Sequence, residues 1–144
     1  MPSLSQSLTF NVNSSSTVVL DYPNTGTTAL IYASDPIKGD GYFGGSDGFH
    51  TVQININEFI GKIEMQGSLA SSPQSTDWFS VELGTNNMSI DTTGLISEEN
   101  ISSVEYTTAT TNIKSYNFTG NYVWIRARVS DWTDGTVNNI RINH

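Results

Sequence analysis

The feature that most constrains the fold is an alternation of apolar and polar residues near the C-terminus. Apolar side chains occupy every second position at Val123, Ile125, Ala127 and Val129. This is the period of a β-strand with one buried face, because successive side chains of a strand point to opposite sides of the sheet. Within Tyr116–His144 we therefore predict a long strand, a tight turn at Asp134-Gly135 and a closing strand, which together form a hairpin.

The closing strand of this hairpin contains a shift in the pattern. Its apolar residues are Val137, Ile140 and Ile142, so the buried face changes from odd to even positions. One extra residue in a strand produces such a shift, which predicts a β-bulge near Asn138-Asn139.

Short apolar runs separated by turn residues fill the rest of the chain. Strands are expected at about Ser7–Asn13, Thr17–Tyr22, Ala29–Ala33, Val52–Asn57, Ile63–Leu69, Trp78–Leu83, Met88–Ile90 and Val104–Ala109. Gly61 separates two of them, and Phe79, Val81 and Leu83 should point inward. One helical turn is expected at Ser97–Ile101, with Ser97 as its N-cap. The pattern predicts a single all-β domain over residues 1–144, an antiparallel β-sandwich or jelly-roll-like fold of about 8–10 short strands.

Composition excludes several classes of function. The chain has 144 residues, a net charge of −8 and only six Lys and Arg residues, so a nucleic-acid partner is not expected. It has no cysteine and therefore no disulfide framework. Its first residues lack the basic and apolar segments of a signal peptide, and it has no apolar run long enough to span a membrane. We expect a protein that is made in a cytoplasm and has no membrane partner.

The polar face of the C-terminal strand is the strongest candidate for a binding surface. It carries Tyr122, Trp124, Arg126 and Arg128, residue types that are enriched at the energetic centres of interfaces. One interpretation is a docking face for a neighbouring subunit, with Trp132, Tyr42 and Phe43 as further interface candidates. A second is a self-satisfied face on which the arginines stack over aromatic rings and pair with acids on adjacent strands. A third is a sugar-binding platform formed by Trp124 and Tyr122.

A glycine-rich loop at Gly39–Gly48 is the next candidate. Five of its ten residues are glycine, and its spacing matches neither a P-loop nor a dinucleotide-binding motif. The favoured interpretation is a flexible surface loop whose aromatic residues offer a second contact surface. Asp35, Asp40 and Asp47 are weak calcium candidates, since calcium needs a cluster of 6–8 oxygen ligands. No metal site and no cofactor are otherwise predicted.

The sequence does not predict an enzyme. Ser46, Asp47 and His50 are too close in sequence for the geometry of a catalytic triad. The adjacent carboxylates of Glu98 and Glu99 diverge from one another, which is unsuitable for a glycosidase pair.

Three segments, taken together, resemble a known family. They are IEMQGSLA at Ile63–Ala70, DWFSVEL at Asp77–Leu83, and FTGNYVWIRARV at Phe118–Val129 followed by Thr133-Asp-Gly-Thr. Their order is similar to that of a β-sandwich module of tailed-phage virion proteins, most of all the small structural proteins of myoviruses that infect marine cyanobacteria. The resemblance covers about His50 to His144, and GYFGGSDGFH in the N-terminal third adds to it.

This resemblance implies a non-enzymatic structural component of a tailed-phage virion. Such a protein would be a head decoration, neck, tail or fibre-associated protein, located in the virion and acting through oligomeric assembly and surface adhesion. Its expected partners are copies of itself and other virion proteins. The alternative is a carbohydrate-binding module or the receptor-binding head of an adhesin, which would use exposed aromatic residues to bind a host-surface glycan.

Overall fold

The computed structural model is an all-β fold, as the sequence predicts. It describes residues 6–7, 10–12, 15–17, 20–21, 30–44, 48–90, 92–94 and 96–143, and describes side chains at 33–44, 48–84, 92–94 and 100–143. The strands are β1 (Gln6–Ser7), β2 (Phe10–Val12), β3 (Ser15–Thr17), β4 (Leu20–Asp21), β5 (Leu30–Ala33), β6 (Ile37–Lys38), β7 (Phe49–Ser68), β8 (Phe79–Ser80), β9 (Leu83–Ile90), β10 (Ile96–Ile101), β11 (Val104–Thr119) and β12 (Trp124–Asn143). No helix long and apolar enough to cross a membrane occurs in the described part of the chain.

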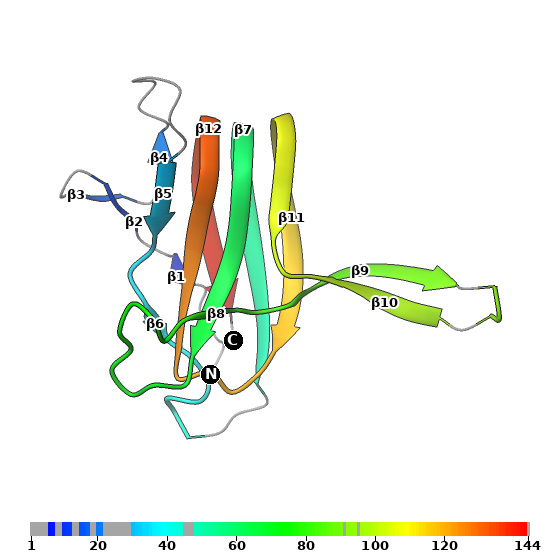
Figure 1. Cartoon of the computed structure of the whole chain (residues 1–144), viewed down its shortest axis with the longest axis horizontal. Helices are drawn as coiled ribbons and strands as arrows, with labels where there is room; N and C mark the ends of the chain where they lie inside the picture. The colour runs from blue at the N-terminus through cyan, green and yellow to red at the C-terminus, as the bar shows by residue number, and fades with distance from the viewer. Residues whose placement is uncertain are drawn as a thin grey trace.

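The main sheet is antiparallel and is organised around three long strands. Its order is β1-β12-β7-β11-β9-β10, while β4, β5 and β6 pair with β12 and β8 pairs with β7. Figure 1 shows that β7, β11 and β12 each run through one layer, turn over at a common end and return in a second layer. The sheet therefore packs against itself, which gives the sandwich its two layers.

The turn-over points explain why the buried face changes within a strand. In β7 the buried residues are Val52, Ile54 and Ile56 before the bend and Ile63 and Met65 after it. The bend contains Glu58 at φ 52° and Gly61 at φ 159°. A residue other than glycine at positive φ is uncommon, and here it changes the direction of the strand. Both limbs of β7 thus present their apolar face to the same core.

A matching bend in β12 corrects the predicted hairpin. Asp131 has φ 51° and Gly135 has φ 81°, and the pairing of β12 with β7 shifts on either side of Asp134. A Cβ atom on Gly135 would lie 2.1 Å from the carbonyl oxygen of Glu58, so the two bends are packed directly against each other. Asp134-Gly135 therefore bends a continuous strand, because both limbs of β12 pair with β7 rather than with each other.

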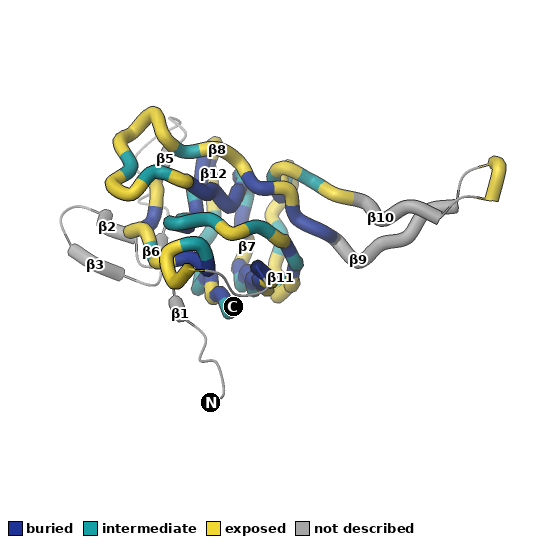
Figure 2. The backbone as a smooth tube through the Cα atoms, turned by 90° about the horizontal axis from the view of Figure 1, so that it is seen from below, coloured by how far each residue is buried: buried dark blue, intermediate teal, exposed yellow. Residues whose placement is uncertain are grey.

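The core lies between the layers, with large aromatic residues at the bend. Trp132 and Phe59 are fully buried, and their ring centroids lie 6.2 Å apart. The Trp132 Nε1–H donates to the carbonyl oxygens of Asp134 and Gly135 at 3.1 and 3.0 Å. Figure 2 shows the buried segments gathered inside the body and the exposed loop before β8 on its outside. Trp132 thus belongs to the core and not to a surface interface.

The remaining strand predictions are confirmed in part. The pairing of β12 shifts between Val137 and Asn139, which confirms the predicted bulge. Val81 and Leu83 are buried as predicted, but Phe79 is 42% exposed because the chain leaves the regular sheet after β8. The expected helical turn at Ser97–Ile101 is wrong. This segment is strand β10, which pairs with β9 from Ile96 to Ile101.

Strands β9 and β10 form a hairpin that extends away from the sandwich (Figure 1). Strand β9 joins the main sheet where Gly84 pairs with Asn117 of β11. The segments Ser7–Asn13 and Thr17–Tyr22, each predicted as a single strand, contain β2 and β4 and overlap β1 and β3 by one residue each, with several of their residues outside the described part of the chain.

Candidate functional site

The Trp groove is a surface hollow of about 490 Å³ on the outer side of one layer. We use this name for the hollow lined by Pro36, Ser71, Ser72, Pro73, Gln74, Ser75, Trp78, Trp124 and Arg126. Trp124 and Arg126 come from β12, and the other residues come from the loop before β8 and the segment before β6. The groove therefore combines a rigid strand with two loop segments.

Trp124 is fixed in orientation by two contacts. Its Nε1–H donates to the carbonyl oxygen of Ser71 at 3.0 Å. Its ring makes an edge contact with Tyr42, with the ring centroids 5.4 Å apart. A half-buried tryptophan held in this way presents a preformed apolar surface at little further entropy cost on binding.

Arg126 forms the second fixed part of the groove. Its guanidinium carbon lies 4.3 Å from the centroid of the Trp78 ring, and its Nε–H donates to Gln66 Oε1 at 2.8 Å. Burial and then the neighbouring charge of Arg128 lower the pKa of Arg126 from its ordinary value, while Glu64 acts in the opposite direction. The cation–π contact and the hydrogen bond together hold the guanidinium at the groove wall.

Arg128 lies on the same outer side but is paired. Its Nη1–H donates to Glu64 Oε1 at 2.9 Å, and the other oxygen of Glu64 accepts from the Ser80 hydroxyl at 2.7 Å. Arg126 over Trp78 and Arg128 with Glu64 form the contacts expected for a self-satisfied face. The interface prediction for Arg126 and Arg128 remains a prediction.

Tyr122 does not share this face. Strand β12 begins at Trp124, so Tyr122 lies before the regular alternation. Its ring packs on Gly67 and Gly120, where added Cβ atoms would lie 2.8 and 2.4 Å from it. Gly67 is paired with Ile125, whose side chain is in the core, so Tyr122 lies on the inner side of the layer. Trp124 and Tyr122 therefore cannot form one platform, and Trp78 takes the place that the sequence suggested for Tyr122.

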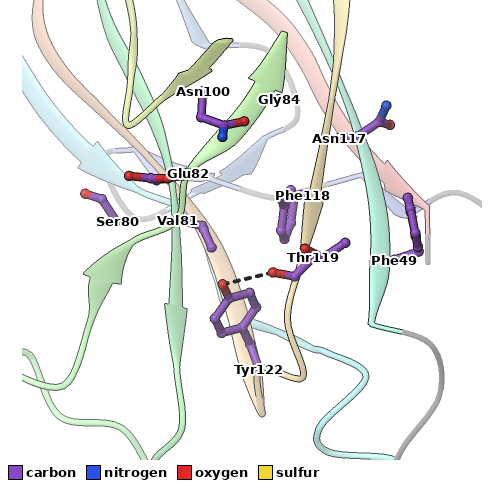
Figure 3. A pocket seen from close by; sticks show the side chains of 10 residues that line it. All are labelled: Phe49, Ser80, Val81, Glu82, Gly84, Asn100, Asn117, Phe118, Thr119 and Tyr122. Atoms are coloured by element: carbon purple, nitrogen blue, oxygen red, sulfur yellow. Dashed lines mark hydrogen bonds between the residues drawn. The ribbon is translucent and has the colours of Figure 1, made fainter. Parts of the chain in front are cut away.

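The Tyr122 pocket is a second hollow, of about 650 Å³, at the base of the β9–β10 hairpin. Figure 3 shows Asn100 and Asn117 on either side of it, with Val81, Phe118 and Tyr122 between and below them. The remaining lining residues are Phe49, Ser80, Glu82, Gly84 and Thr119. The Tyr122 hydroxyl donates to the Thr119 carbonyl oxygen at 3.3 Å, and burial followed by the charge of Glu82 raises the pKa of Tyr122. Glu82 is the only charged side chain among the described residues that line this pocket.

The glycine-rich loop is anchored to the residues that precede β12. Gly39 and Gly41 donate backbone hydrogen bonds to the carbonyl oxygens of Val123 and Tyr122, each at 2.9 Å. Added Cβ atoms at these glycines would lie 2.3 and 2.2 Å from backbone oxygens, so the close approach requires glycine. Tyr42 and Phe43 are 46% and 65% exposed, consistent with a contact surface next to the Trp groove.

The two calcium candidates that the structure describes, Asp40 and Asp35, lie in different environments. Asp40 is buried and its carboxylate accepts a hydrogen bond from the Gly48 amide at 3.0 Å, whereas Asp35 is exposed. Asp47, Ser46 and His144 lie outside the described residues. Over the described ranges, no three His, Cys, Asp or Glu side chains gather in a way that could hold a metal ion. His50 is buried and stacks on Phe118 with the ring centroids 4.7 Å apart.

The comparisons with known proteins concern the fold. No protein-family model matches the chain, and no curated protein matches it in sequence. Three solved structures are similar in shape. A family 29 carbohydrate-binding module from Piromyces equi has a TM-score of 0.39 and 12% identity, covering 97% of this chain and 80% of the module. The modules of Clostridium thermocellum xylanase 10B named CBM22-1 and GH10 have a TM-score of 0.38 and 9% identity, covering 97% of this chain and 24% of that one.

The third is the K3 cleaved adhesin domain of Lys-gingipain from Porphyromonas gingivalis. It has a TM-score of 0.39 and 8% identity, covering 99% of this chain and 74% of that one. At these identities and TM-scores the three similarities say nothing about function. What the Trp groove can bind is therefore argued from its own residues.

Proposed function

We propose that this protein is a non-catalytic carbohydrate-binding domain whose ligand site is the Trp groove. The observation that carries the proposal is the arrangement of Trp78, Trp124 and Arg126 around one surface hollow. Sugar rings present apolar C–H faces that pack on indole rings, while their hydroxyl groups need hydrogen-bonding partners. The serine and glutamine residues of the loop before β8 supply such partners at the rim.

Pre-organisation of the groove supports this function. Trp124 is held by Ser71 and Tyr42, and Trp78 is covered on one ring face by Arg126. Ligand sites typically combine apolar walls with a few fixed polar groups, which is the composition found here. The exposed rings of Tyr42 and Phe43 extend the aromatic surface beyond the groove.

The direct test is a glycan array followed by calorimetric titration of the intact chain. We expect Trp124→Ala to weaken binding of the best saccharide at least tenfold, because the stacking surface is lost. Trp124→Phe should keep part of the affinity, since a ring remains although the hydrogen bond to Ser71 is lost. Ile113→Ala, a large exposed side chain outside the groove, is the matched control. If no saccharide binds, or if binding is indifferent to Trp124→Ala, this function is wrong.

The virion role suggested by the sequence resemblance is a second proposal, and the two are compatible because an adhesin can also be a virion protein. The observation that favours it is the β9–β10 hairpin, which extends from the body and ends the main sheet at strand β10 (Figure 1). A two-stranded hairpin is marginally stable alone, so a neighbouring subunit would stabilise it. Measurement of the solution mass, followed by location of the chain in a particle map, tests this role. A strictly monomeric protein that is absent from virions would exclude it.

A further inference from the structure

The Trp groove contains a cation that is held in place without being neutralised. Arg126 uses its Nε–H for Gln66 and one face of its guanidinium for Trp78. Among the described residues, no carboxylate lies within salt-bridge distance of it, whereas Arg128, two residues later, pairs with Glu64. The two terminal amino groups of the Arg126 guanidinium thus have no hydrogen-bond acceptor in the described part of the chain.

A planar guanidinium in this state is suited to binding an oxyanion. It presents two parallel N–H donors, which match the oxygen spacing of a carboxylate or sulfate. The lowered pKa of Arg126 fits this geometry, since its causes are burial and the like charge of Arg128. A guanidinium remains charged at ordinary pH, so a bound anion would provide the compensating charge that is missing.

A second cation lies at the edge of the groove. Lys38 is paired with Trp124 between β6 and β12, and its ammonium lies 4.5 Å from the centroid of the Tyr42 ring. The whole chain has a net charge of −8 with only six lysine and arginine residues, so two of them at one hollow form a local exception. Of the nearby acids, Asp77 accepts from the Gln74 amide at 2.6 Å, and neither Asp77 nor Asp35 lines the groove.

We propose that the Trp groove selects acidic saccharides, with Arg126 binding a carboxylate or sulfate group while Trp124 packs against the sugar ring. This inference rests on the proposed function and adds the chemical class of the ligand. Lys38 contributes long-range attraction at the rim. The negative charge elsewhere on the chain disfavours binding of polyanions at other surfaces, which confines recognition to this groove.

The test is calorimetric titration of the intact chain with three probes of matched length. These are an oligogalacturonate, a sulfated galactan oligosaccharide and a neutral galacto-oligosaccharide. We expect at least one acidic probe to bind tenfold or more tightly than the neutral probe. The two acidic probes show whether carboxylate or sulfate is preferred. Affinity for the acidic probe should fall several-fold between about 50 mM and 500 mM salt, because screening weakens charge pairing.

Substitutions test whether Arg126 is the group that binds the acidic probe. Arg126→Gln should reduce affinity for the acidic probe to that for the neutral one, and Arg126→Lys should restore only part of it, since an ammonium keeps the charge but not the planar donor pair. Arg141→Gln removes the same charge from an exposed position in the other limb of β12 and should change affinity less than twofold.

The possible failures can be told apart. Equal binding of neutral and acidic probes that depends on Trp124, with no response to salt, overturns acidic selection and leaves carbohydrate binding in place. Absence of binding to every saccharide overturns the proposed function itself. The salt dependence is measured on the unaltered protein, so it decides the inference even if Arg126→Gln fails to fold.

Discussion

The Trp groove and the Tyr122 pocket contain aromatic residues only two positions apart, Trp124 and Tyr122, yet the two sites differ in location and charge. The groove opens on the outer side of a layer and contains the held cation of Arg126. The pocket opens at the base of the β9–β10 hairpin, and Glu82 supplies its charge. Trp124 obeys the alternation of β12, while Tyr122 precedes the strand and packs inward on two glycines. Within a strand, residues two apart lie on the same face, so Tyr122 could lie opposite Trp124 only because it precedes the start of β12.

The largest loss of stability is expected from a substitution at the packed bends of β7 and β12, on which both regions depend. Trp132→Ala should lower the free energy of unfolding by about 3–5 kcal/mol, because it leaves a cavity beside Phe59 and removes two hydrogen bonds. Urea unfolding measures this change. Leu69→Ala, at a side chain that is largely exposed, should cost no more than about 0.5 kcal/mol. A Trp132→Ala loss as small as that of Leu69→Ala would mean that the bend does not stabilise both layers.

A smaller change should affect the pocket and spare the groove. Gly67→Ala would place a Cβ atom 2.8 Å from the Tyr122 ring and should cost about 1–3 kcal/mol through overpacking. In a Tyr122→Ala background the same substitution should cost almost nothing, because the clashing ring is gone. Thermal unfolding of the four proteins of this double-mutant cycle gives the coupling.

Saccharide binding in the Trp groove is the second measurement on the same variants. Saccharide binding should persist in Gly67→Ala, since Trp78, Trp124 and Arg126 lie on the other side of the layer. Additive costs in the cycle, or loss of saccharide binding with Gly67→Ala alone, would contradict the separation of the two regions.

The smallest effect is expected at alkaline pH. Burial, and then the charge and hydrogen bond of Tyr106, raise the pKa of Tyr116 above its ordinary value. Burial, and then Glu82, raise that of Tyr122. A raised pKa means that the folded state holds the proton more tightly. This stability is therefore complete below about pH 10, the ordinary tyrosine pKa, and is lost as the pH rises further.

Denaturant midpoints measured between about pH 9 and pH 11 test this direction. Each buried tyrosine contributes a slope of at most about 1.4 kcal/mol per pH unit. Tyr116→Phe should flatten the decline, and saccharide binding in the groove should not follow the same titration. An unchanged slope in Tyr116→Phe would show that other groups cause the alkaline loss.

Much of the fold could be predicted from local sequence patterns. The alternation in Val52–Asn57 and in Ile125–Val129 correctly identified which apolar residues are buried, because period two follows from strand geometry itself. In Ile63–Leu69 it identified Ile63 and Met65 but was wrong at Leu69, which is 66% exposed. The bulge at Asn138-Asn139 was also visible as a change of parity. The site was less predictable. Trp124 and Arg126 stood out by residue type, but Trp78 was predicted only as the start of a strand, and no local pattern relates it to residues 46 and 48 positions later.

Neighbours along the chain were enough to predict an all-β chain, the buried residues of the most regularly alternating segments and a face of β12 with unusual chemistry. Whether Asp134-Gly135 bends one strand or closes a hairpin could not be predicted in this way, because the outcome depends on the contact between Gly135 and Glu58. The same holds for the burial of Trp132 in the core, the inward orientation of Tyr122 and the packing of Trp78 on Arg126. Each of these depends on residues far apart in sequence, whose proximity is set by how the long strands fold over.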